Sequence, residues 1–162
     1  MTISVGDKLP DATLLTMGKD GPEGVSLATK LAGRSVILFG LPGAYTSTCT
    51  NAHVPSFMRA KDALMAKGVD EIICVSVNDP FVMKAWGEST GALAAGITML
   101  ADADAAFTKS TGMAFSAPPV GFIDRSVRYA LHAVDGVVKV IHSEESPGTC
   151  DASGGEAMLA AI

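Results

Sequence analysis

Cys49 is the residue whose position in this chain most favours chemistry. It follows the apolar run Val36–Phe39, after a break at Pro42–Gly43, and a helical pattern begins close to it. A strand that turns into a helix places the thiol near the helix N-terminus, where unpaired backbone N–H groups and the helix dipole favour negative charge. Such surroundings favour the thiolate, which is the nucleophilic form of cysteine. We therefore expect Cys49 to be reactive.

Two further cysteines, Cys74 and Cys150, leave several interpretations open. Three widely spaced cysteines are unlike a disulfide framework, so redox catalysis, a metal site and simple burial all remain. Cys74 lies in the apolar run Ile72–Val75, which is typical of a buried strand, and Cys150 lies in a polar loop. A disulfide requires Cα atoms within about 7 Å, and spacing along the chain does not give that distance.

A metal or cofactor site is not predicted. Cys49 and His53 are four residues apart, which on a helix places two possible ligands on one face. A structural metal site normally needs four ligands, and the other cysteines and histidines show no ligand spacing. Glycine-rich phosphate loops and nucleophile-elbow motifs are also absent, so we expect no nucleotide, nicotinamide or flavin cofactor.

Composition predicts one globular domain over residues 1–162. The chain is 48% hydrophobic and 18% charged, which is enough apolar material for a sizeable core. Its formal net charge is −5 and its basic residues are scattered, so we expect neither a nucleic-acid nor a membrane partner. No apolar run approaches the roughly 20 residues of a membrane span, and Met1–Ser4 lacks the features of a secretory signal. The expected location is the cytoplasm.

Apolar and β-branched runs predict five strands, and the intervening patterns predict helices. Asp135–Gly136 favours a tight antiparallel hairpin, because glycine readily adopts positive φ. Asp79 and Pro80 mark a helix start, Pro55 is expected to kink the first helix, and Ser153 with Glu156 resembles a capping box. The expected strands are Val36–Gly40, Glu71–Val77, Ile97–Ala101, Val127–Val134 and Val137–His142, and the expected helices are Thr46–Lys67, Pro80–Ser89, Ala103–Thr111 and a short C-terminal helix.

Alternating strands and helices followed by a hairpin indicate an α/β fold with a mixed central sheet and helices on both faces. This arrangement predicts a thioredoxin-like three-layer sandwich, although the pattern alone also permits other α/β sandwiches. Residues 42–49, with the sequence PGAYTSTC, followed by His53-Val54-Pro55, resemble the peroxidatic loop of peroxiredoxins. Residues 69–87 and 125–130 are similar to the type II, atypical peroxiredoxins, and the resemblance covers nearly the whole chain.

The resemblance implies a thiol peroxidase that reduces hydrogen peroxide and alkyl hydroperoxides through one peroxidatic cysteine, which becomes a sulfenic acid. By position, that cysteine is Cys49, Thr46 is its hydroxyl partner, Pro42 shields the pocket and Arg128 supplies a guanidinium. The substrate would bind at Pro42, Gly43, Thr46 and Arg128. Cys74 resembles the resolving cysteine of plant-type relatives, and Cys150 resembles that of the animal-type branch.

The implied reductant is thioredoxin, glutaredoxin or glutathione. A homodimer is also implied, with apolar surface expected from Pro42, Tyr45, Phe81 and Trp86. The chain departs from the family in having Ser47 where proline is usual, which predicts a less rigid loop. The alternative function is a redox sensor that uses the same cysteine to oxidise a protein partner without rapid turnover.

Overall fold

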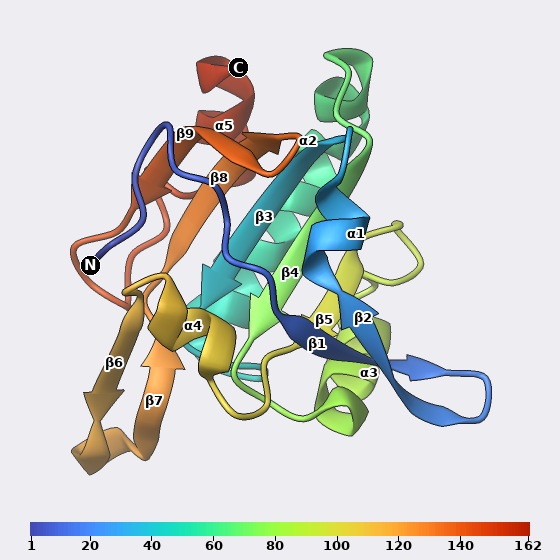
Figure 1. Cartoon of the computed structure of the whole chain (residues 1–162). Coiled ribbons are helices and arrows are strands. Elements are labelled where there is room, and N and C mark those ends of the chain that lie inside the picture. The colour runs from blue at the N-terminus through green and yellow to red at the C-terminus, as the bar shows by residue number, and fades with distance from the viewer.

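The computed structural model describes residues 1–162 and contains a mixed sheet of seven strands (Figure 1). The strands lie in the order β2-β1-β5-β4-β3-β8-β9, and β6 and β7 form a separate two-stranded sheet. β3, β4 and β5 run parallel, while β8 pairs antiparallel with β3. The strands are β1 (Thr13–Gly18), β2 (Gly21–Ser26), β3 (Ser35–Leu41), β4 (Glu71–Ser76), β5 (Thr98–Ala101), β6 (Ala114–Ala117), β7 (Phe122–Ser126), β8 (Tyr129–Val134) and β9 (Val137–Ser143).

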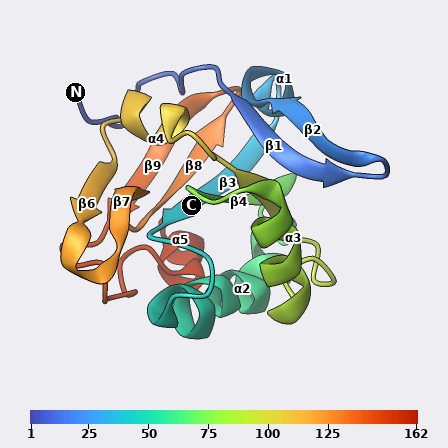
Figure 2. The same ribbon diagram turned by 90° about the horizontal axis from the view of Figure 1, so that it is seen from below.

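Helices cover both faces of the large sheet, as the sequence predicted (Figure 2). On one face α1 and α4 contribute Leu27, Leu31 and Phe107 to the core. On the other face α2 and α3 contribute Phe57 and Trp86, together with α5. None of the helices combines the length and the apolar character needed to span a bilayer. The helices are α1 (Leu27–Leu31), α2 (Val54–Ala66), α3 (Pro80–Ser89), α4 (Ala106–Ser110) and α5 (Gly155–Ala161), with a 3-10 turn at Pro118–Val120.

The five predicted strands are present as β3, β4, β5, β8 and β9. The β8–β9 hairpin turns at Asp135 and Gly136, whose φ angles are 50° and 76°, as the tight-turn signal predicted. One predicted boundary is wrong, because Val127 and Arg128 lie in a short break between β7 and β8 and not inside a strand. This break turns the chain from the small sheet into the large one.

Four strands and one helix were not predicted. β2 contains two glycines and Pro22, a composition that strands disfavour, and it is tolerated because β2 lies at the edge of the sheet. β6 and β7 are short and are joined by the proline-rich 3-10 turn Pro118–Val120. α1 has only five residues, with Ser26 as its N-cap. None of these segments has enough periodicity to indicate its structure.

The predicted helix Thr46–Lys67 is divided in two. Its first part includes the π-helical turn Cys49–His53, hereafter the π-turn, in which the N–H of Val54 donates to the carbonyl of Cys49. Regular α2 follows and has Pro55 in its first turn, where a missing N–H costs little. The kink expected at Pro55 is therefore present as the wider π-turn just before it, which begins at Cys49.

Two predicted helix starts need correction, and one is confirmed. Asp79 caps α3 by accepting from the N–H of Val82, as predicted. α4 begins only at Ala106, because the buried carboxylate of Asp102 accepts the N–H groups of Phe107 and Thr108. Ser153 forms no capping box, since its hydroxyl donates to Glu144 instead and the N-cap of α5 is Gly154.

Candidate active site

Cys49 is the first residue of the π-turn and is buried against the large sheet. The turn follows the carboxyl end of β3, which pairs parallel with β4 and antiparallel with β8 and whose last residue is Leu41. Trp86 of α3 holds the turn from the side, because its indole N–H donates to the hydroxyl of Thr50 at 3.0 Å. The thiol is thus fixed in a packed region, near the helix start that the sequence predicted.

Arg128 brings the only guanidinium that contacts this thiol. Its Nη2 lies 3.2 Å from the Sγ of Cys49 and also donates to the carbonyl of Pro147 at 2.8 Å. The side chain is 1% exposed although it carries a charge, and its Nε is the one buried side-chain polar atom without a hydrogen-bond partner. A buried charge is costly unless it is paired, so this guanidinium favours a negative sulfur beside it.

His53 holds the other side of the Arg128 guanidinium. Its Nε2 faces the carbonyl of Ser153 at 3.0 Å, which can only accept, so Nε2 carries the proton and Nδ1 accepts from Nη1 of Arg128 at 3.0 Å. Burial, followed by the charge of Arg128, lowers the pKa of His53 from 6.5 to about 3. The ring is therefore neutral at ordinary pH. Both ring nitrogens form hydrogen bonds within the protein, so neither is free to bind a metal together with Cys49.

A cavity of about 190 Å³ opens in front of this group of residues. Thr46 contributes a hydroxyl to its wall, and that hydroxyl donates to the carbonyl of Gly43 at 2.7 Å. Cys49 does not line the cavity and is buried behind Arg128 and residues 42–48, hereafter the active-site loop. Ser47, which replaces the usual proline, is exposed at the rim. The lining residues are Pro42, Thr46, Ser47, Thr48, Phe122, Arg128, Pro147 and Gly148.

Arg125 acts on the loop and not on Arg128. Its Nη1 donates to the carbonyl of Pro42 at 3.0 Å. Its guanidinium also lies over the ring of Phe122, with Cζ 5.5 Å from the ring centroid. The residue therefore contacts two walls of the cavity.

Glu144 is a residue of the site region that the sequence did not reveal. Its carboxylate accepts from the N–H groups of Asp151 and Ser153 and from the Ser153 hydroxyl, at 2.7 to 2.9 Å. These hydrogen bonds lower the pKa of Glu144 against the effect of its partial burial. They hold the loop that carries Pro147 and Cys150 against the site. A single glutamate after a strand has no pattern by which such a role can be recognised.

The two remaining cysteines differ in their surroundings. Cys74 lies in the middle of β4, between Phe39 of β3 and Met99 of β5, and is fully buried. Burial raises the pKa of its thiol well above the ordinary value, and the nearby Cys49 raises it further. Cys150 is half-buried in the loop held by Glu144. Burial raises the pKa of the Cys150 thiol, while the Arg128 guanidinium lowers it.

The loop of Cys150 lies directly beside the π-turn. The hydroxyl of Thr48, the residue before Cys49, donates to the carbonyl of Gly148 at 3.1 Å. Arg128 contacts the same loop through Pro147. Cys150 therefore lies two residues along the chain from Gly148, which contacts the residue before Cys49.

The apolar surface expected for a dimer is only partly present. Tyr45 and Phe81 are exposed, but Pro42 and Trp86 are buried in the protomer and offer no surface. Pro42 belongs to the loop after β3 and lines the cavity, and the side chain of Trp86 packs from α3 into the core.

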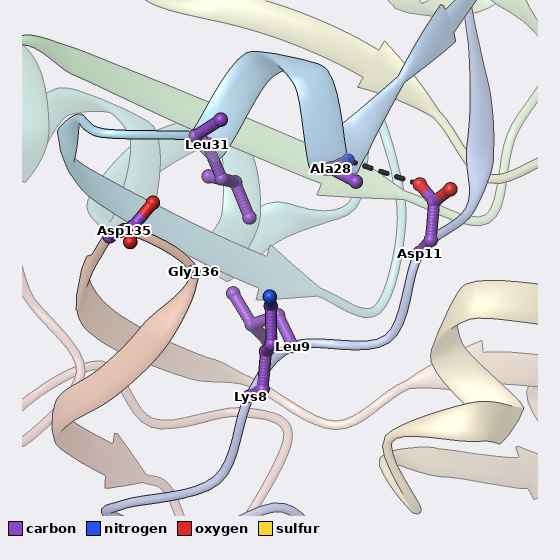
Figure 3. Close-up of a pocket in the computed structure, with 8 residues that line it drawn as sticks. Lys8, Leu9, Asp11, Ala28, Leu31, Asp135 and Gly136 are labelled. Carbon is purple, nitrogen blue, oxygen red and sulfur yellow. Dashed lines mark hydrogen bonds between the residues drawn. The ribbon is translucent and has the colours of Figure 1, made fainter.

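A second hollow, of about 310 Å³, lies at the opposite end of β3 beside the β8–β9 turn (Figure 3). Leu9, Leu31 and the chain at Gly136 form part of its wall. Its two carboxylates are already used, because Asp11 accepts from the N–H of Ala28 and Asp135 from that of Gly33. No cysteine lies there, so the cavity lined by Arg128, which contacts the Cys49 thiol, is the candidate active site.

Within the thioredoxin-like fold, a buried cysteine at a helix start that faces a guanidinium instead of a second cysteine defines the class of thiol-dependent peroxidases. The family model described as Redoxin matches residues 4–159. The chain belongs to this family and, within it, to the type II peroxiredoxins. The comparisons thus confirm the thiol peroxidase function predicted from the sequence and do not favour the redox sensor.

Relatives of known name support this assignment over the full chain. The chain is 49% identical to peroxiredoxin-2E-2, chloroplastic, of Oryza sativa, over 99% of this chain and 73% of the relative. It is 44% identical to peroxiredoxin-2C of the same plant, over 99% and 98% of the two chains. Among solved structures, reduced Prx3 of Vibrio vulnificus in complex with H2O2 matches with a TM-score of 0.92 and 44% identity, over 99% of each chain.

Proposed function

We propose that Cys49 is the peroxidatic cysteine of this peroxidase and that Arg128, Thr46, Pro42 and Gly43 form its substrate site. The single observation that carries the assignment is the 3.2 Å contact between Nη2 of Arg128 and the Sγ of Cys49. A charge-assisted contact of this kind favours the thiolate and is aimed at the place where a peroxide must react.

The proposed reaction consumes one hydroperoxide and two thiol equivalents. The Cys49 thiolate attacks the nearer peroxide oxygen, the O–O bond breaks, and Cys49 becomes a sulfenic acid while an alkoxide or hydroxide leaves and takes up a proton. A first thiol displaces water from the sulfenic acid and forms a disulfide. A second thiol reduces that disulfide and regenerates Cys49.

Ionisation of the thiol supplies only part of the rate. A cysteine is already a few per cent ionised at neutral pH, so full ionisation gains at most about 30-fold, or about 2 kcal/mol. The remainder is assigned to donors that face the departing oxygen as its charge develops. Arg128 is suited to this task because its guanidinium is fixed on both sides, by His53 and by Pro147.

Replacement of the reactive sulfur tests the assignment directly. Cys49→Ser should abolish turnover of hydrogen peroxide and of tert-butyl hydroperoxide in the presence of a recycling thiol. Cys74→Ser is the matched control, because it makes the same atomic change at another buried position of the same core cluster. Peroxidase activity in Cys49→Ser, or its loss only in the control, would contradict the assignment.

For recycling, we infer that Cys150 is the better-placed partner of oxidised Cys49. Its loop touches the active-site helix through Thr48, and its thiol is partly accessible. Cys74 would instead have to leave a central strand that is hydrogen bonded on both sides. Cys49 is itself buried, so a bond to Cys150 requires the π-turn to unwind.

Mass mapping without reduction, after one equivalent of peroxide, decides how the enzyme is recycled. A Cys49–Cys150 bridge is expected. A Cys49–Cys74 bridge, or only a mixed disulfide when glutathione is present, would contradict the inference and indicate the other route. Parallel assays with thioredoxin, glutaredoxin and glutathione would then identify the reductant, which we propose to be one of these three.

Residues 1–162 are proposed to act as one peroxiredoxin domain, to form a homodimer and to reside in the cytoplasm. Three unpaired cysteines fit a reducing compartment. Exposed Tyr45 and Phe81 supply apolar surface near the active-site loop for a second copy. Sedimentation of the reduced and oxidised protein tests the dimer, and cell fractionation tests the compartment.

A further inference from the structure

Arg125 joins two walls of the active-site cavity that belong to different parts of the fold. Pro42 stands on the loop after β3 and accepts a hydrogen bond from Nη1 of Arg125 at 3.0 Å. Phe122 stands on β7, and its ring lies 5.5 Å from Cζ of the same guanidinium. Both residues line the cavity.

The wall formed by Phe122 is not positioned by the large sheet. β7 pairs only with β6, and these two strands project from the body of the molecule (Figure 1). Phe122 rests edge-to-face on Phe115 of the neighbouring strand, with ring centroids 6.1 Å apart. Arg125 therefore links the small sheet to the active-site loop across the cavity.

Gly43 leaves the space that this arrangement requires. A methyl group at Gly43 would overlap with Nη1 of Arg125, so any larger residue there must displace the guanidinium. The φ angle of Gly43 is not in the left-handed region, and the backbone itself would accept alanine. Glycine at this position is thus explained by the passage of Arg125 and not by backbone conformation.

We propose that Arg125 is a specificity-determining residue that keeps the cavity narrow and so favours small hydroperoxides over bulky ones. The inference rests on the proposed function, in which the peroxide enters this cavity. At about 190 Å³, the cavity is smaller than the roughly 300 Å³ at which pockets for drug-sized ligands begin. Arg125 reaches the reacting atoms only through Pro42 and Phe122, so it is a positioning residue.

The test compares kcat/KM for cumene hydroperoxide with kcat/KM for hydrogen peroxide in each variant. Arg125→Ala should raise this ratio by roughly tenfold, the low end of the discrimination that one methylene gives in a tight pocket. Gly43→Ala should raise it similarly, because it displaces the guanidinium without removing the charge. The double variant should show no more than the larger single effect, since both changes break the same contact.

Two controls separate the proposed role from loss of charge and from loss of structure. Arg59→Ala removes an exposed arginine that pairs with Glu156 and does not line the cavity, and it should leave the ratio unchanged. Arg125→Lys retains a donor for Pro42 and should give an intermediate ratio. Circular dichroism identifies a variant that does not fold, in which case Gly43→Ala alone carries the test.

An unchanged ratio in Arg125→Ala and Gly43→Ala, an equal loss of both activities, or additive effects in the double variant would overturn the inference. These results would leave the peroxidase assignment intact as long as the wild type consumes both peroxides. A wild type that consumes neither would refute the proposed function, and the inference with it.

Discussion

A fall in pH from about 7 to about 5 should weaken the fold through His53. In the folded protein, burial and the neighbouring Arg128 lower the pKa of His53 from 6.5 to about 3. The unfolded chain therefore takes up a proton at His53 in this range, while the folded protein does not. The contribution of His53 to stability is present above pH 6.5 and is lost as the pH decreases, because the unfolded state then binds more protons.

The size of the effect follows from that interval. One pH unit with a whole proton of difference corresponds to about 1.4 kcal/mol, and the unfolded histidine is protonated over about 1.5 units between pH 6.5 and 5. His53 should therefore cost about 2 kcal/mol of unfolding free energy between pH 7 and pH 5. Glu71 and Glu144, whose pKa values are also lowered, lose their contributions below the ordinary value of 4.5, outside this range.

The control is His53→Gln, which is neutral at every pH tested. Its amide can donate to Ser153 and accept from Arg128, as the histidine ring does. His132 also has a lowered pKa because of burial, and it remains in both proteins, so its contribution cancels in the comparison. Urea unfolding followed by far-ultraviolet circular dichroism at the two pH values gives the free energies. An equal pH dependence in wild type and His53→Gln would refute the reasoning.

Two further substitutions test other parts of the site. Arg128→Lys should lower the second-order rate constant with hydrogen peroxide by about 100-fold, as loss of an aligned donor typically does. The reason is that one ammonium cannot contact Cys49, His53 and Pro147 together. A near-normal rate constant in stopped flow would contradict this prediction. Glu144→Gln should cost about 1–2 kcal/mol of stability and speed amide hydrogen exchange in residues 149–153, because it removes a charged acceptor shared by several loop donors. Unchanged exchange there would show that the carboxylate does not hold the loop.

The central elements of the fold could be predicted because their signals are local. β3 and β4 are continuous apolar runs, Asp135–Gly136 specifies its own turn, and Asp79 caps α3. The β1–β2 hairpin could not be predicted, because its edge strand is built from residues that strands disfavour. β2 forms a strand because it pairs with β1, and its own composition does not indicate this.

The reactive residues of the site could be predicted from the sequence, but most of the hydrogen bonds that position them could not. Position beside a strand and the family resemblance singled out Cys49 and Arg128, which the structure brings into contact across 79 residues of chain. The acceptor role of His53 could not be predicted, since it depends on a carbonyl 100 residues away that determines which ring nitrogen carries the proton. The contact of Arg125 with Pro42 likewise spans 83 residues and leaves no local pattern.

The bond between the Trp86 indole and Thr50 gives the protein an intrinsic optical reporter. The chain has a single tryptophan, so its emission comes from one environment, which lies against the turn that must unwind before Cys49 can form a disulfide. Each catalytic cycle that passes through such a disulfide would release this indole and later recapture it. Oxidation and recovery can then be followed in real time without any label.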